Sequence, residues 1–80
     1  LRKHGLSFET ACEVFADPLH LSIPDRVVDG EQRWQTMGAI DGTIVAMVAH
    51  TWKDEHGEEV VRIISARKAT RQERRRYENG

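Results

Sequence analysis

The sequence predicts a small α+β domain, in which an antiparallel β meander is flanked by an N-terminal helix and a C-terminal arginine-rich helix. Three observations favour this class: a helical spacing of apolar residues near the start, β-rich runs separated by turn signals, and a helix-capping motif before the basic end. Eighty residues suffice for one small core, so we expect a single domain over residues 1–80. A hydrophobic content of 39% and a charged content of 31% are typical of a folded chain rather than a disordered one.

The N-terminal helix is predicted to follow Ser7, a favourable N-cap residue. Asp17 and Pro18 should end it, because a residue that precedes proline is disfavoured in helical geometry. Cys12 should be buried on its apolar face, and a single cysteine suits a reducing cytoplasm. The apolar positions follow the spacing i, i+3, i+4, i+7: Phe8, Ala11, Cys12 and Phe15.

The meander is predicted from alternating apolar residues and turn signals. A short edge strand should end at Pro24, with a loop over 25–31. The runs 32–40 and 43–52 flank Asp41-Gly42, which is typical of a two-residue type I′ hairpin turn. In that register Arg33 lies opposite His50, and the two side chains share a face.

The last strand and the last helix are predicted from the segment after residue 58. A connection over 53–58 should lead to a strand over 59–67, which is apolar enough to be central in the sheet. Thr70 and Glu73 fit a capping box, so a helix should begin at about residue 71. This helix is so polar that we expect its attachment to be weak, or to be completed by a partner.

The charge is divided unequally along the chain. Residues 1–61 hold five Lys/Arg against eleven Asp/Glu, whereas residues 62–80 hold seven against two. A cationic cluster on a strand and a helix is suited to bind phosphate oxygens. No glycine-rich phosphate loop, cysteine pair or nucleophile elbow is present, the four histidines are scattered, and no apolar run could span a membrane. We therefore expect no metal, no cofactor and no membrane contact.

Several basic and acidic residues are candidates for chemistry, each with a plainer alternative. Arg67 ends a strand and is held by a rigid frame, or it is simply solvated. Arg62 should face the opposite side from Arg67 unless the strand bulges or Arg67 lies past its end. Arg33 with His50 could clamp a phosphate and donate a proton, or form a structural pair. Glu31 could act as a base, or pair with an arginine.

The C-terminal helix and the N-terminal residues add two further candidate groups. The helix arginines could bind nucleic acid or an acidic protein, or form a solvent face. A direct reading of DNA is disfavoured, because no second helix is arranged for groove entry. Lys3 and His4 precede Gly5 and could mark no more than a helix stop. The helix arginines in question are Arg71, Arg74, Arg75 and Arg76.

The chain strongly resembles the BrnT family, which are toxins of type II toxin–antitoxin systems. The specific part is the pattern RIISAR-x-AT-x-x-ER-x-x-Y, over residues 62–77. Further matching segments are Lys3 to Glu9, Ala11, Phe15 to Pro18, Glu31-x-Arg33-Trp34 and Met37-Gly38. The family usually begins with a strand ahead of the first helix. This chain opens without methionine on residues like a helix end, so we expect it to be a fragment that lacks that strand.

The resemblance implies a RelE-like fold and an endoribonuclease that halts translation in the cytoplasm. It also implies neutralisation by a BrnA-type antitoxin, with operator DNA bound only through that antitoxin. The matching positions that it marks as functional are Lys3, His4, Glu31, Arg33, Arg62 and Arg67. Metal-free RNA cleavage needs a proton acceptor, cations around the phosphorane and a proton donor, and His4 or His50 could shuttle the proton. The competing hypothesis is a non-catalytic basic module that binds an acidic antitoxin or nucleic acid.

Overall fold

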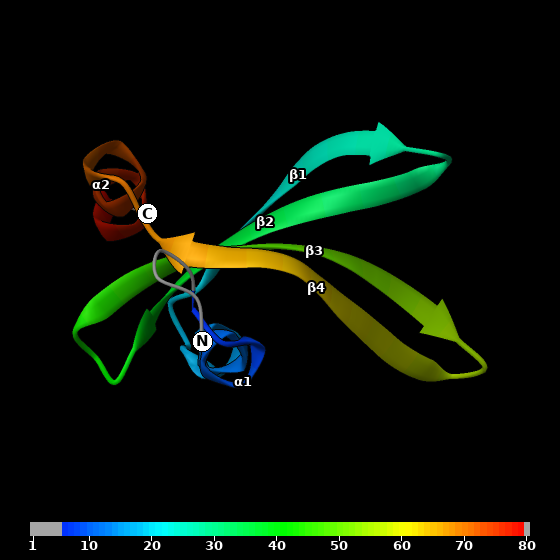
Figure 1. Cartoon of the computed structure of the whole chain (residues 1–80), viewed down its shortest axis with the longest axis horizontal. Helices are drawn as coiled ribbons and strands as arrows, with labels where there is room; N and C mark the ends of the chain where they lie inside the picture. The colour runs from blue at the N-terminus through cyan, green and yellow to red at the C-terminus, as the bar shows by residue number, and fades with distance from the viewer. Residues whose placement is uncertain (1–5, 80) are drawn as a thin grey trace.

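Four antiparallel strands in the order β1-β2-β3-β4 form the centre of the molecule (Figure 1). The computed structural model describes residues 6–79. A short helical segment precedes the sheet and a second helix follows it, so the predicted α+β class is confirmed. The elements are α1 (Phe8–Ala11), the 3₁₀ helix η1 (Cys12–Ala16), β1 (Leu21–Val28), β2 (Glu31–Ile40), β3 (Ile44–Glu55), β4 (Glu58–Lys68) and α2 (Arg71–Asn79).

The N-terminal helix begins and ends where the sequence predicts. The Ser7 side chain accepts a hydrogen bond from the Thr10 backbone N–H at 3.1 Å, and the helical residues stop before Asp17. After Ala11 the helix tightens to 3₁₀ geometry, in which every third residue shares a face. Ala11 and Val14 are therefore buried, whereas Cys12 is exposed. The prediction of a buried Cys12 was wrong, because it assumed an α-helical period throughout.

β1 extends beyond the proline that was expected to end it. The strand continues to Val28 through an irregularity between Pro24 and Val27, and a tight turn at Asp29-Gly30 leads into β2. The predicted loop over 25–31 was therefore wrong. β1 does lie at an edge of the sheet, where a proline needs no ladder partner for its missing N–H.

The β2–β3 hairpin has one more turn residue than predicted. Asp41 and Gly42 adopt φ values of 54° and 70°, as a type I′ turn requires, but Thr43 also belongs to the turn. Pairing resumes at Ile40 with Ile44, so the register is shifted by one residue.

β3 and β4 form a longer hairpin than predicted. They continue to a tight turn at His56-Gly57, so the predicted connection over 53–58 was wrong. Among residues 6–79, β4 lies at an edge of the sheet rather than at its centre. Its apolar residues Val60, Val61 and Ile64 are correspondingly exposed.

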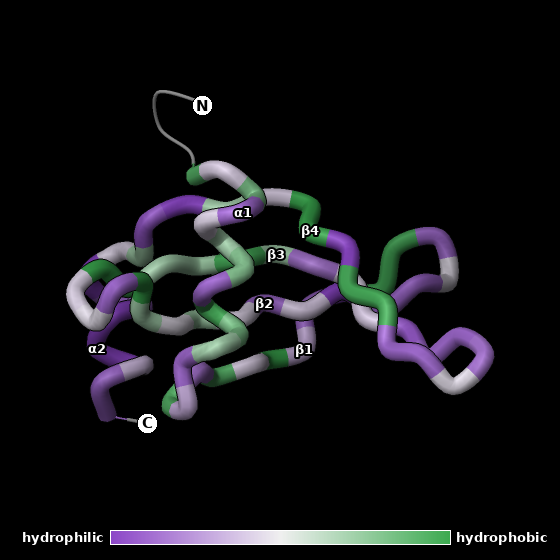
Figure 2. Tube along the Cα trace, turned by 90° about the horizontal axis from the view of Figure 1, so that it is seen from below, coloured by the Kyte–Doolittle hydropathy of each residue, from purple (hydrophilic) through white to green (hydrophobic). Residues whose placement is uncertain are grey.

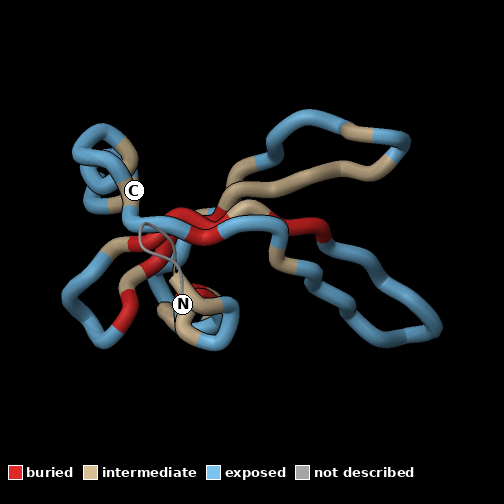
Figure 3. The backbone as a smooth tube through the Cα atoms, viewed as in Figure 1, coloured by how far each residue is buried: buried red, intermediate tan, exposed pale blue. Residues whose placement is uncertain are grey.

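The two helices cover opposite faces of the sheet near one end (Figure 1). η1 packs on β2 at Gly38, where an added Cβ would lie 2.7 Å from the Val14 carbonyl oxygen. Arg67 points from the other face and contacts Glu73 of α2. The buried residues gather around the centre of the sheet, whereas the outer part of the β3–β4 hairpin is exposed and the outer part of β2 is partly buried (Figure 3).

Polar contacts attach α2 to the rest of the fold. The helix has no buried residue, and its trace is almost wholly hydrophilic (Figure 2). The Tyr77 hydroxyl donates to the Asp17 carboxylate, which also accepts from the Ala39 backbone N–H at 2.8 Å. These two hydrogen bonds, that of Tyr77 foremost, lower the pKa of Asp17. Asp17, which stops the first helix, thus also anchors the last one.

Candidate functional site

Basic side chains from three strands share one face of the sheet, which we call the basic sheet face. In the register, Arg33 of β2 lies opposite Thr51, and Thr51 lies opposite Arg62 of β4. Directly paired residues of antiparallel strands project to the same side. Since strands are about 4.8 Å apart, the Cα atoms of Arg33 and Arg62 are about 10 Å apart. Lys53 follows Thr51 by two residues and belongs to the same face.

A bulge in β4 adds Arg67 to this face. His50 pairs with Ile63 and Ala49 pairs with Ser65, which leaves Ile64 as an extra residue. Arg62 therefore pairs with Thr51 and Arg67 with Met47, which are four residues apart on β3 and face the same way. The two arginine backbones are separated by about 13 Å along the sheet. The sequence predicts opposite faces for these two arginines unless the strand bulges, and this bulge places them on the same face.

Small and uncharged residues form the floor between the two arginine positions. Gln35, Ala49 and Ser65 lie in register with one another across β2, β3 and β4. Ser65 is exposed, and Ala49 and Gln35 are partly exposed. The basic sheet face therefore combines uncharged residues in the middle with cations at both ends.

Glu31 lies at the end of the face that carries Arg62 and Lys53. Its carboxylate lies 3.3 Å from Nη2 of Arg62 and 3.2 Å from Nζ of Lys53. Of the two interpretations of Glu31, the structure shows the ion pair. Both contacts engage the carboxylate of Glu31, so they position Arg62 and Lys53.

Arg33 retains an unused donor. Its Nε is buried and has no hydrogen-bond partner among residues 6–79. A buried donor without an acceptor is costly, so Arg33 carries an unfavourable polar group within the fold.

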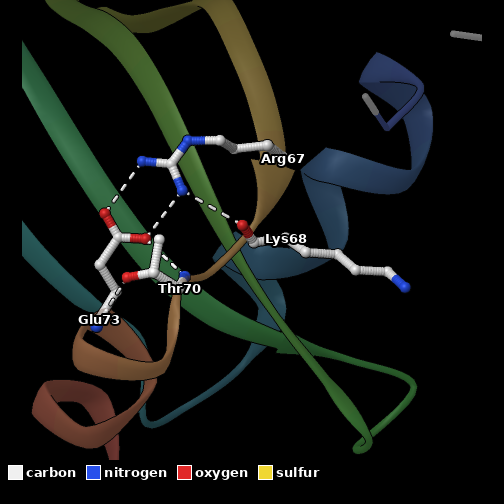
Figure 4. Close-up of polar contacts among 4 residues, drawn as sticks. All are labelled: Arg67, Lys68, Thr70 and Glu73. Atoms are coloured by element: carbon white, nitrogen blue, oxygen red, sulfur yellow. Dashed lines mark hydrogen bonds and ion pairs between the residues drawn. The ribbon is translucent and has the colours of Figure 1, made fainter. Parts of the chain in front are cut away.

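Arg67 is held rigidly by the first turn of α2 (Figure 4). Its two terminal nitrogens donate to both oxygens of Glu73, at 2.8 and 3.0 Å, and Nη1 also donates to the Lys68 carbonyl at 3.2 Å. Glu73 completes the predicted capping box by accepting from the Thr70 N–H at 2.8 Å, while its own N–H donates to the Thr70 hydroxyl. Of the five donors of the guanidinium, two remain for a ligand.

The Arg67–Glu73 pair makes the stability of the fold depend on pH. The hydrogen bond from Arg67 lowers the pKa of Glu73 from its ordinary 4.5 to about 2. A lowered folded-state pKa means that the carboxylate stabilises the fold above about pH 4.5 and loses this effect as the pH falls through about 2. We expect Glu73→Gln to lower the Tm by about 4 °C at neutral pH and by nothing at the acid end, in thermal scans of both proteins. A gap that stays constant across this pH range would contradict the prediction.

His50 lies on the opposite face from the arginines. The register pairs it with Trp34 rather than Arg33, so the predicted Arg33–His50 clamp was wrong, because Thr43 adds a residue to the hairpin turn. Its ring is buried, and Nε2 is hydrogen bonded to the Thr36 hydroxyl at 2.7 Å. Burial lowers the pKa of His50. These properties describe a neutral structural histidine.

The remaining candidates lie at the two ends of the chain. Lys3 and His4 are outside the described residues. The four α2 arginines are all exposed, and Arg74 pairs with Glu78 at 3.5 Å. Within the described part of the chain, no three metal-ligating side chains gather.

Two features of the face were absent from the sequence interpretation. Lys53 falls in the predicted connection over 53–58 but lies in β3, and its alternation with Thr51 is the signal that places it on the face. Glu73 was recognised only as a cap, and its pairing with Arg67 depends on how α2 turns back over the sheet.

The fold and this face define a small α+β domain with a cationic sheet surface. A family model described as the ribonuclease toxin BrnT of type II toxin–antitoxin systems matches residues 1–73. The chain belongs to the BrnT family of ribonuclease toxins, and a family of this type has an antitoxin as partner. A search of curated proteins finds no match. No helix among residues 6–79 has the length and apolar character needed to cross a bilayer.

Proposed function

We propose that this protein is a metal-independent endoribonuclease that binds single-stranded RNA across the basic sheet face. The observation that carries the proposal is the bulge at Ile64, which brings Arg33, Arg62 and Arg67 to one side of the sheet. Arginine is permanently charged and matches phosphate geometry with two parallel donors. The separation along the sheet suits contacts to one RNA strand, with the reacting phosphodiester between Arg33 and Arg67.

The chemistry uses the 2′-hydroxyl of the RNA as the nucleophile. Arg33 and Arg67 stabilise the negative charge that develops on the phosphorane, through the terminal guanidinium nitrogens of Arg33 and the free donors of Arg67. Glu31 holds Arg62 and Lys53 in place. Because His50 faces away, we assign the proton transfer to the Lys3–His4 segment, on the strength of the family motif.

The α2 arginines are the proposed contact for the antitoxin. They are exposed on a helix without buried residues, so an acidic partner could pair with them and complete the packing of α2. A BrnA-type antitoxin would neutralise the toxin in the cytoplasm, where free toxin arrests translation, and operator DNA would be bound through the antitoxin.

One observation favours a second function. Glu73 occupies the fork of Arg67 and Glu31 occupies Arg62, so the protein already neutralises two of its cations. A non-catalytic module that binds an acidic protein or nucleic acid would tolerate this arrangement.

Incubation of a naked RNA with the purified protein in EDTA tests the first proposal. We expect cleavage by the wild type and a loss of about 100-fold in Arg33→Ala, while Arg26→Ala, an exposed arginine in the β1 bulge, should cleave normally. Equal faint cleavage by all three proteins would favour the non-catalytic module.

For the antitoxin, an Arg71/Arg74/Arg75 triple alanine variant should bind more weakly, and the wild-type complex should weaken steeply with salt.

A further inference from the structure

A hollow lies on the face of the sheet opposite to the basic side chains, and we call it the aromatic hollow. It has a volume of about 310 Å³ and is lined by aromatic rings, one serine and one carboxylate. It opens between η1, the start of β1 and the exposed part of the β3–β4 hairpin, which bends toward the side of α1 (Figure 1). The side chains that the argument uses are Phe15, His20, Trp34, His50, Trp52 and Glu59.

Aromatic rings make up most of the walls. Trp34 lies opposite His50 in the register, and the Phe15 ring packs edge-on against His50 with centroids 5.0 Å apart. Trp52 is 46% exposed although it is a large apolar side chain. The faces of indole rings carry partial negative charge and attract cations, so walls of this kind favour a cationic group over a neutral one.

The charged residues at the opening of the hollow also favour a cationic ligand. Glu59 lines the hollow and lies opposite Asp54 in the register, so the two carboxylates share this face. Neither of them forms an ion pair within residues 6–79. His50 is buried and hydrogen bonded to Thr36, and none of the lysines and arginines among residues 6–79 lines the walls.

We propose that the aromatic hollow binds an arginine side chain of a partner protein, with the guanidinium stacked on Trp34 and Trp52 and its charge directed toward Glu59. Planar guanidinium groups stack on aromatic faces and pair with carboxylates, so both parts of the site match. A nucleobase could stack on the same rings, but its phosphates would meet the Glu59 and Asp54 carboxylates. The proposal goes beyond the ribonuclease function and does not depend on it.

The intrinsic fluorescence of the protein reports directly on this site, because the chain has only two tryptophans and both line the hollow. The probe is the peptide Ac-Ala-Arg-Ala-NH₂, and its twin with neutral citrulline in place of arginine is the reference. We expect the arginine peptide to change the emission with a roughly millimolar Kd at low salt. The citrulline peptide should bind about five times more weakly.

Two exposed carboxylates offer a matched pair of variants. Glu59→Gln should weaken the arginine peptide about five-fold, whereas Glu58→Gln, one residue away on the opposite face, should leave its Kd unchanged. Trp52→Ala should weaken it about ten-fold, read through Trp34, and thermal scans verify that each variant is folded. Equal binding of the two peptides, or equal effects of the two glutamate variants, would overturn the proposal. So would a short single-stranded RNA whose binding is lost in Trp52→Ala, since this would assign the hollow to a base.

Discussion

Replacing Arg67 with alanine is expected to reduce RNA cleavage by about 100-fold, because one preorganised donor to the developing oxyanion is lost. The side chain is fixed by a two-point pair with Glu73 and by the Lys68 carbonyl, so it needs little reorganisation when the phosphate arrives. The measurement is the initial rate of cleavage of a fluorescent RNA by the purified protein in EDTA.

The control for Arg67 is Arg71→Ala, an exposed arginine in the first turn of α2. Its cleavage rate should remain near that of the wild type. Because the loss of Arg67 also frees Glu73, Glu73→Gln serves as the second reference: it breaks the same pair but keeps the arginine. If Glu73→Gln lost as much activity as Arg67→Ala, the role of Arg67 would be to hold α2, and the assignment to phosphate binding would be wrong.

The substitution Gly38→Ala is expected to destabilise the fold by about 2 kcal/mol, because β2 and η1 are too close for a side chain. A Cβ at Gly38 would lie 2.7 Å from the Val14 carbonyl oxygen and 2.8 Å from Val14 Cγ1. The first of these is a backbone atom, so a change of side-chain rotamer cannot relieve it. For a chain of this length we expect the Tm to fall by about 10 °C.

Urea and thermal unfolding of Gly38→Ala beside Ser65→Ala measure this effect. Ser65 is an exposed residue of β4. Because replacements at exposed positions have small effects, the Tm should change by no more than about 2 °C. A Tm for Gly38→Ala equal to that of the wild type would mean that η1 moves away from the sheet at little cost.

Local interactions determined the parts of this fold that the sequence predicts correctly. The Ser7 N-cap, the stop at Asp17-Pro18 and the capping box of Thr70 and Glu73 each depend on residues within a few positions of one another. The positive φ angles at Asp41-Gly42 follow from the turn residues themselves. Family membership also follows from the sequence, because it depends on the order of residues and not on their placement.

The tertiary structure alone decided which side chains meet. One extra turn residue, Thr43, removes His50 from the face of Arg33, and one extra strand residue, Ile64, places Arg62 and Arg67 on the same face. Side chains alternate with a period of two along a strand, so a shift of a single residue moves every following side chain to the other face. Neither shift has a local signal, since each is settled by pairing across strands and by packing against the helices. The sequence therefore determined the elements and the charge of this protein, and long-range register determined the site.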